Sequence, residues 1–135
     1  MNMKRCDIGS SRFVIGILTT VLGIAATAQA GPPLICHAIN IGQAKSLPWP
    51  GNAWNLSGNE NYNPANLVSD TLAILNPATP VLVRMETLRR ATLYARKDPI
   101  LAKELLIRLY QRTTEAAGRT NGLAWFDAGY LAACY

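Results

Sequence analysis

From residue 63 onward, apolar and polar positions recur with the spacing of α-helices. Three dipeptides, Asn63-Pro64, Thr79-Pro80 and Asp98-Pro99, each place a good N-cap residue before a proline. Proline fits the first helical position because its missing N–H would have no helical partner there. The pattern predicts helices over residues 64–75, 80–97 and 99–117, with Gly118 as the stop of the third, and a fourth helix starting near residue 121.

Each predicted helix carries one apolar face. The fourth has a single charged residue, Asp127, which is typical of a buried helix. On the second helix we expect Arg84, Arg89, Arg90 and the other basic residues to lie mostly off the apolar face. The apolar face of the first helix consists of Leu67, Val68, Leu72 and Leu75, and that of the second consists of Val81, Met85, Leu88, Ala91 and Ala95. The third helix has Ala102, Leu105, Leu106, Leu109 and Thr113 on this face, and the fourth has Leu123, Trp125, Phe126, Leu131 and Tyr135.

The joint Lys97-Asp98 is very short, so we expect the second and third helices to fold back as an antiparallel hairpin. Residues 31–63 are dense in proline, glycine and asparagine and form a loop-rich arm. The predicted fold class is therefore all-α. Antiparallel helical hairpins, about four helices in a solenoid or a small bundle, follow a loop-rich N-terminal arm.

The first thirty residues resemble a secretory signal peptide. Lys4, Arg5 and Arg12 precede an apolar stretch, and Ala28-Gln29-Ala30 has the small-x-small form of a signal peptidase site. The stretch is shorter than the roughly 20 residues of a membrane-spanning helix. We predict a signal peptide over 1–30, an arm over 31–63 and a helical domain over 64–135, exported to the periplasm or secreted. An uncleaved anchor is the alternative.

The C-terminal run Ala132-Ala133-Cys134-Tyr135 has no helix stop signal. Either the last helix docks tightly onto the others, or the natural chain continues beyond Tyr135.

The charge is only mildly positive. The chain has 13 basic and 8 acidic residues, and three of the basic residues and one of the acidic residues lie in the leader. The sequence does not predict nucleic-acid binding, and it leaves the oligomeric state open.

Cleavage would remove Cys6 and leave Cys36 and Cys134. Two cysteines in an exported chain predict one disulfide, and the alternative is two separate buried thiols. The only histidine, His37, follows Cys36, but haem attachment needs a C-x-x-C-H motif, and Pro33 occupies its first position. Zinc takes about four nitrogen or sulfur ligands. We therefore expect no metal and no cofactor, and His37 to be a loop or surface residue.

Four arginines, Arg84, Arg89, Arg90 and Arg108, are candidates for a surface on the second and third helices that meets an acidic partner. The alternative is a solvated face, on which Glu86–Arg90 and Glu104–Arg108 pair one turn apart. The partner would be another envelope or secreted protein. No constellation of acids, bases and nucleophiles predicts an enzyme, because the carboxylates show no tight pair.

Trp49 and Trp54 flank Pro50-Gly51 in the arm. One hypothesis is an exposed aromatic pair that, with Tyr62, grips a sugar or a peptide. The other is that both indoles pin the arm to the helices. A small secreted ligand-binding protein that uses this arm is thus the main alternative function, ahead of a small secreted enzyme.

The segment ATLYARKDPILAKELLIRL, residues 91–109, resembles the centre of a tetratricopeptide repeat, with Ala102 at the alanine where two helices pack closest. AWFDAG, residues 124–129, resembles the start of the next unit. Glu86 stands where the repeat's first aromatic is expected, and residues 118–122 lengthen the period. The resemblance covers about residues 80–135. It implies a helical protein-binding or scaffold module, non-enzymatic, with too few repeats for a full solenoid.

Overall fold

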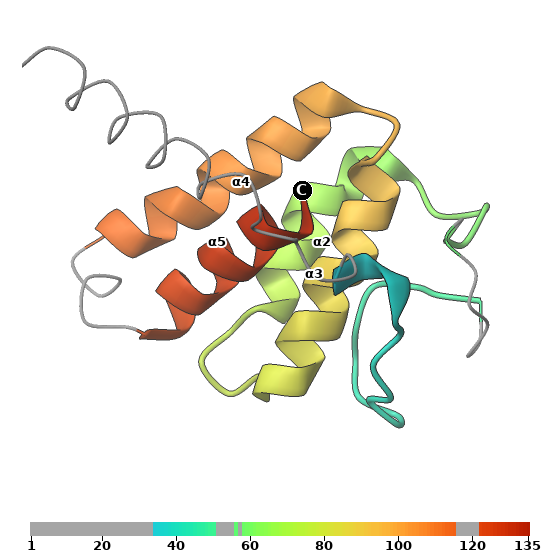
Figure 1. Cartoon of the computed structure of the whole chain (residues 1–135), viewed down its shortest axis with the longest axis horizontal. Helices are drawn as coiled ribbons and strands as arrows, with labels where there is room; N and C mark the ends of the chain where they lie inside the picture. Colours follow the sequence, from blue (N-terminus) through green and yellow to red (C-terminus); the bar gives the residue numbers. More distant parts are fainter. Residues whose placement is uncertain (1–33, 51–55, 57, 116–121) are drawn as a thin grey trace, which may run out of the picture. The chain divides into compact units, whose positions relative to one another are not determined.

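A computed structural model describes residues 34–50, 56, 58–115 and 122–135 (Figure 1). The chain divides into two compact units, Met1–Gly31 and Pro32–Tyr135, and every described residue belongs to the second. The predicted signal peptide over 1–30, and with it the cleavage site, lies outside the described residues.

All the secondary structure of the described residues is helical, which confirms the all-α prediction with four α-helices. Two short 3₁₀ turns accompany them. The elements are η1 (Leu34–Cys36), η2 (Pro64–Asn66), α2 (Leu67–Ile74), α3 (Val81–Ala95), α4 (Pro99–Thr114) and α5 (Gly122–Cys134).

Two of the three predicted N-caps are present. The side chain of Asn63 accepts a hydrogen bond from the backbone of Ala65 at 3.0 Å, and Asp98 Oδ1 accepts from Ile100 and Leu101. The third prediction is wrong, because Pro80 itself occupies the N-cap position of α3. The Thr79 hydroxyl instead donates to the carbonyl of Ile74 at 2.5 Å. It closes the turn between α2 and α3 rather than capping α3.

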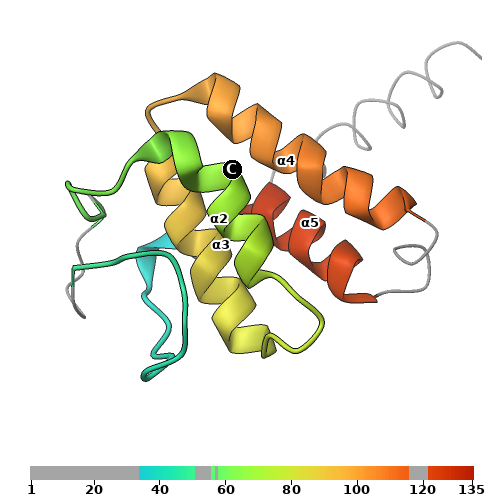
Figure 2. The same cartoon turned by 180° about the vertical axis from the view of Figure 1, so that it is seen from behind.

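Helices α4 and α5 run side by side in opposite directions, and so do α2 and α3 (Figures 1 and 2). The Lys97-Asp98 joint does turn the chain, but α4 packs mainly on α5 and α2 and touches α3 little. The predicted hairpin of the second and third helices is therefore not a packed pair. The buried surface of α3 is shared among α2, α5 and η1, which leaves little of it for α4.

The hydrophobic core is a set of leucines from all four helices, joined by Leu47 from the arm. Leu47 is only 1% exposed, so the arm completes the core instead of merely covering it. Burial of each such side chain contributes about 1.5–3 kcal/mol. The helical leucines concerned are Leu67, Leu75, Leu88, Leu105, Leu109 and Leu131.

The fourth helix is only partly buried, contrary to prediction. Ala124, Ala128 and Leu131 line its buried side, whereas Trp125 is 53% exposed. Trp125 follows Ala124 directly, and successive helical residues point in directions about 100° apart. Small alanines at the contact let α5 approach its neighbours closely and turn the indole outward. Val81 of α3 is likewise exposed.

Among the described residues, every helix is too short or too polar to cross a bilayer.

Candidate functional site

Helix α3 buries polar side chains at two separate places, one against the arm and one against α5. Arg84, Glu86 and Arg89 are each at most 2% exposed. Buried charges are costly unless they are paired and hydrogen-bonded, so their contacts decide what this surface can do. The prediction that Arg84 and Arg89 lie on an exposed surface is wrong.

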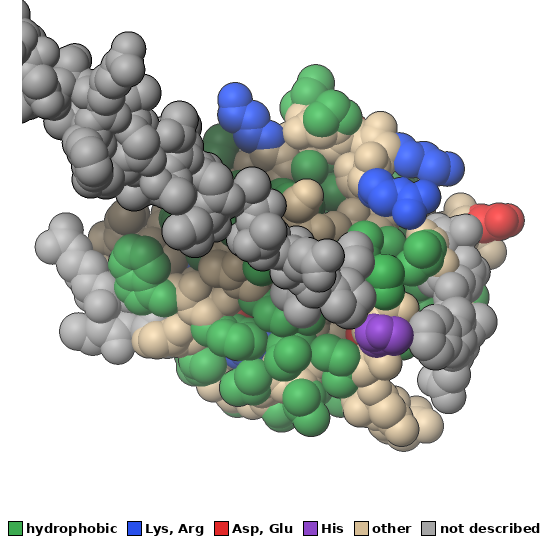
Figure 3. All heavy atoms as spheres, viewed as in Figure 1, with side chains coloured by type: hydrophobic (Ala, Val, Ile, Leu, Met, Phe, Trp, Pro, Cys, Tyr) green, Lys and Arg blue, Asp and Glu red, His purple; other side chains and the backbone are tan. Residues whose placement is uncertain are grey.

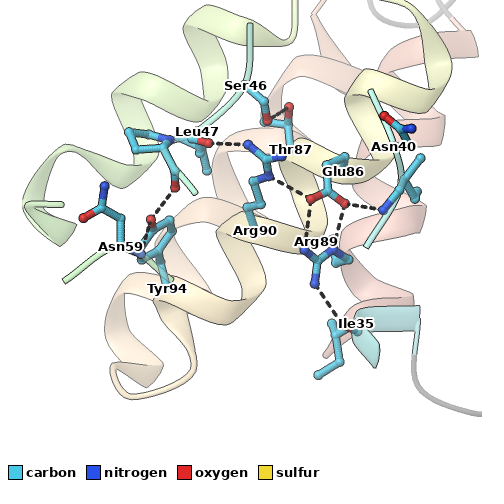
Figure 4. Close-up of polar contacts among 12 residues, drawn as sticks. Ile35, Asn40, Ser46, Leu47, Asn59, Glu86, Thr87, Arg89, Arg90 and Tyr94 are labelled. Carbon is cyan, nitrogen blue, oxygen red and sulfur yellow. Dashed lines mark hydrogen bonds and ion pairs between the residues drawn. The ribbon is translucent and has the colours of Figure 1, made fainter. Parts of the chain in front are cut away.

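Glu86 is the centre of the first cluster (Figure 4). Its carboxylate accepts two hydrogen bonds from Arg89, at 2.8 and 2.9 Å, and one from Arg90 Nε at 2.8 Å. A fourth comes from the backbone N–H of Ile39 in the arm, at 2.9 Å. The predicted Glu86–Arg90 pair is confirmed, but it is buried at the acid and not a surface pair.

The environment of Glu86 has two opposing effects on its pKa. Burial would raise the pKa, but the hydrogen bonds from Arg89, Ile39 and Arg90 outweigh burial and lower it. The carboxylate is therefore held ionised, as an acceptor for the arm and the two arginines. A carboxylate that stays ionised at neutral pH and already accepts four hydrogen bonds is unsuited to proton transfer there.

Both arginines of this cluster also bind backbone carbonyls of the arm. Arg89 Nη1 donates to Ile35 at 3.1 Å, and Arg90 Nη1 donates to Leu47 at 2.6 Å. Ser46 and Thr87 share a further hydrogen bond at 2.8 Å. We call this set of contacts between α3 and residues 35–47 the arm clamp. It occupies these arginines internally, so they are not available to an acidic partner.

Trp49 packs against the same arginines. Their guanidinium carbons lie 5.0 Å (Arg89) and 5.9 Å (Arg90) from the indole centroid, within cation–π range. The ring of Tyr94 meets the indole edge-on at 5.9 Å. Trp49 therefore pins the arm to α3, which favours the packing hypothesis over the open aromatic platform for this residue. Trp54, its predicted companion, lies outside the described residues.

Arg84 belongs to a second buried cluster, where α3 meets α5. Its Nη1 binds Asp127 Oδ2 at 2.5 Å, and its other nitrogens donate to the carbonyls of Thr79 and Asn76. Arg112 of α4 donates to Leu75 at 2.6 Å. Three successive carbonyls at the end of α2 are thus hydrogen-bonded: that of Ile74 by the Thr79 hydroxyl, that of Leu75 by Arg112 and that of Asn76 by Arg84. Burial raises the pKa of Asp127, against the effect of Arg84.

The fourth predicted arginine, Arg108, is exposed on α4, where Nη1 lies 3.5 Å from Gln111 Oε1. Among the described residues no ion pair joins it to Glu104, contrary to the predicted pairing. The four arginines chosen from the sequence therefore divide among three locations. They do not form one binding surface.

A hollow of about 360 Å³ lies beside the arm clamp, at the C-terminal end of α3. Tyr62 and Tyr94 stand in its wall with ring centroids 4.5 Å apart. Their hydroxyls are engaged: Tyr62 donates to Asp70 at 2.8 Å, and Tyr94 donates to the Pro48 carbonyl and accepts from Asn59. Both hydroxyls are therefore already hydrogen-bonded within the protein.

Two cations stand at the same hollow. Arg96 and Lys97 are exposed, and neither takes part in the three ion pairs of the described residues. Glu60 and Leu93 also line it. Arg96 and Lys97 are among the basic residues of the second predicted helix that were expected to lie off its apolar face. Nothing local in the sequence separates them from the other basic residues of that helix, because the hollow depends on where the arm packs.

Both described cysteines, the half-buried Cys36 and the buried Cys134, are free thiols. Burial raises the pKa of Cys134, opposed by a hydrogen bond with Thr92. The predicted disulfide is thus not present in this structure. His37 is exposed, in the loop after η1. Within the described ranges, no three or more histidine, cysteine, aspartate or glutamate side chains gather in a way that could hold a metal ion.

Comparisons of the chain with models of known protein families, with curated proteins and with solved structures give no match. The tetratricopeptide resemblance therefore stays a prediction, and function must be argued from the hollow and the arm clamp themselves.

Proposed function

We propose that the protein is an exported, non-enzymatic helical binding module, and that it takes an acidic segment of another envelope or secreted protein into the hollow beside Tyr94. Export is inferred from the leader at residues 1–30. The helical scaffold holds the arm and the wall of the hollow in one fixed arrangement.

The observation that carries this proposal is the contrast between two sets of cations on α3 and at its end. Arg84, Arg89 and Arg90 are committed to internal partners. Arg96 and Lys97 remain at a concave site with two aromatic rings. Exposed cations around an aromatic hollow suit a carboxylate that is followed by an apolar or aromatic side chain.

The contacts of Gly58 and Asn59 with Tyr94 support a binding role for the hollow, because they fix its wall before any partner arrives. Gly58 has a φ of +74°, and a Cβ atom there would lie 2.6 Å from Tyr94 Cε1. Asn59 then donates its backbone N–H to the Tyr94 hydroxyl at 2.9 Å. A preformed site loses less conformational entropy on binding than one that must be ordered.

The alternative of a ligand-binding arm built on Trp49 and Trp54 has less support. Two guanidinium groups lie over the ring of Trp49, and the ring of Tyr94 packs roughly perpendicular to it. We extend the proposal to one further feature of an exported chain: an oxidising compartment would expose Cys36 and Cys134 to disulfide formation.

The test is a binding titration of the full chain against fluorescent acidic, neutral and basic peptides that share one apolar-aromatic core. We expect the acidic peptides to bind best, with affinity falling as salt rises. The variant Arg96→Glu/Lys97→Glu should weaken binding roughly tenfold, the effect of reversing two exposed charge pairs. Lys45→Glu is the control, because Lys45 is also exposed but lines a different hollow. Equal binding of acidic and basic peptides, or an unaffected double variant, would refute the proposal.

A further inference from the structure

The outward side of α4 carries an apolar stripe. Ile100, Ile107 and Tyr110 are 80%, 45% and 46% exposed, although all three are large apolar side chains. Residues three, four and seven positions apart share one face of a helix, so the three form a single line along α4. The buried residues Leu105, Leu109 and Thr113 lie on the opposite side. In both views α4 lies at the edge of the helical unit (Figures 1 and 2).

Three exposed charged residues lie within or beside this stripe: Lys103, Glu104 and Arg108. With about 100° between successive residues, Glu104 and Arg108 fall on one flank of Ile107, and Lys103 falls on the other flank with Tyr110. Glu104 and Arg108 are one turn apart, yet they form no ion pair among the described residues. Their charges remain available to a partner.

We propose that this face of α4 binds α4 of a second copy of the chain in an antiparallel, two-fold symmetric dimer. Placing the symmetry axis beside Leu106 and Ile107 sets Glu104 opposite Arg108 of the second copy. The same register sets Lys103 opposite the ring of Tyr110 of the second copy. Ile107 then packs beside its own counterpart, and every contact occurs twice, as in an isologous interface.

Charge complementarity is the reason to choose a second copy over another partner. In an antiparallel pair of identical helices, two residues lie opposite each other when their residue numbers add up to one fixed value, and that value defines the register. The pair 104 with 108 and the pair 103 with 110 have sums that differ by only one, so one register satisfies both flanks. A cation facing an aromatic ring is favourable, and an acid facing an arginine is favourable, while the apolar stripe supplies burial.

This inference is independent of the proposed binding function, because no α4 residue lines the hollow at Tyr94. Elsewhere on the surface, Figure 3 shows hydrophobic side chains around α5 and the start of α3, and nothing about that region indicates what would cover it. One helix per subunit makes a small contact, so the dimer belongs to the weak class of interfaces.

The test is sedimentation equilibrium of the full chain as the cell makes it, over a range of concentrations. We expect a reversible monomer–dimer equilibrium. Ile107→Lys should abolish the dimer, because it places two charges side by side at the symmetry axis. Leu82→Lys is the matched control: Leu82 is 57% exposed on α3 and should leave the equilibrium unchanged. Circular dichroism should show the same helical content in all three proteins.

Charge exchange distinguishes this interface from general stickiness. Glu104→Arg should raise the dissociation constant roughly tenfold, since like charges then face each other twice. Glu104→Arg/Arg108→Glu should restore it, because the exchanged pair meets itself across the two-fold axis. A wild-type chain that stays monomeric at all concentrations, including one that binds only a different protein through α4, would overturn the proposal. So would a double variant no better than the single one.

Discussion

The carboxylate of Glu86 accepts the backbone N–H of Ile39 at 2.9 Å across 47 positions of the sequence. One buried acid on α3 therefore holds a segment that the sequence separates widely from it. Arg89 and Arg90 bind the same carboxylate and reach the arm at Ile35 and Leu47. Glu86 is thus the shared acceptor of the arm clamp, and its removal would leave both Arg89 and Arg90 without their ion-pair partner.

Replacing Glu86 with glutamine should destabilise the protein strongly. It leaves two cations facing an uncharged group, and breaking a buried ion pair on one side costs about 3–5 kcal/mol. The free energy of unfolding from urea titrations, followed by circular dichroism, measures this. Glu115→Gln is the control, at an exposed acid outside the ion pairs of the described residues, and should change stability by less than about 0.5 kcal/mol. A small effect at Glu86 would mean that the network contributes little to folding.

The stability of the protein should fall in acid, and Glu86 should account for part of the fall. Its pKa is lower in the folded chain than its usual 4.5, so its contribution is full above that value and is lost as the pH falls through the folded pKa. Asp127 acts with the opposite sign, because burial raises its pKa. Urea titrations from neutral pH down to about pH 3 should show a shallower pH dependence for Glu86→Gln than for the wild type. Parallel curves would contradict the ionised state of Glu86.

Among the described glycines, Gly58 should lose the most stability when it is replaced by alanine. Alanine there must adopt a φ of +74° and place Cβ 2.6 Å from the Tyr94 ring, so we expect a loss of about 2–4 kcal/mol. Gly42→Ala shares the positive φ, but with open space around it should cost only about 1–2 kcal/mol. Gly129→Ala, within α5 and also in open space, should gain about 0.5–1 kcal/mol. Thermal unfolding ranks the three, and any other order would argue against the close approach of Gly58 to Tyr94.

The two described thiols should differ in reactivity. Cys36 is half-buried, whereas Cys134 is 8% exposed with a pKa raised by burial, which reduces its thiolate fraction. Site-resolved mass spectrometry after brief alkylation should find Cys36 modified first. The same spectra, recorded without reductant on exported protein, test the disulfide by a mass two daltons below the reduced form. Equal labelling rates in reduced protein would contradict the burial of Cys134.

The helices were predictable because their signals are local. Asn63 and Asp98 cap their helices through bonds to residues two or three positions away, so spacing alone identifies them. Helix pairing depends on distant contacts. The short Lys97-Asp98 joint predicted a packed hairpin, but the arm, α2 and α5 cover the surface of α3 that α4 would have needed.

The arginines were misplaced for a related reason. A periodicity argument assigns charged residues to the solvent face, and nothing local indicates that Arg84 pairs with Asp127 of α5. The lone acid in an otherwise apolar helix was the available signal, because a buried helix retains a charge only when a partner is present. Likewise, the Glu86 carboxylate accepts a hydrogen bond from the backbone N–H of Ile39 in the arm, and the sequence does not reveal the path of the arm.

Hydrogen exchange at the Ile39 amide tests the arm clamp most directly. The clamp predicts strong protection of this amide in the native chain, since its hydrogen bond ends on a buried carboxylate. In Glu86→Ala the protection of Ile39 should collapse, while the Leu88 amide in the middle of α3 stays protected under conditions where the variant remains folded. An Ile39 amide that exchanges at the unprotected rate in the wild type, or equally slowly in both proteins, would show that Glu86 does not hold the arm in place.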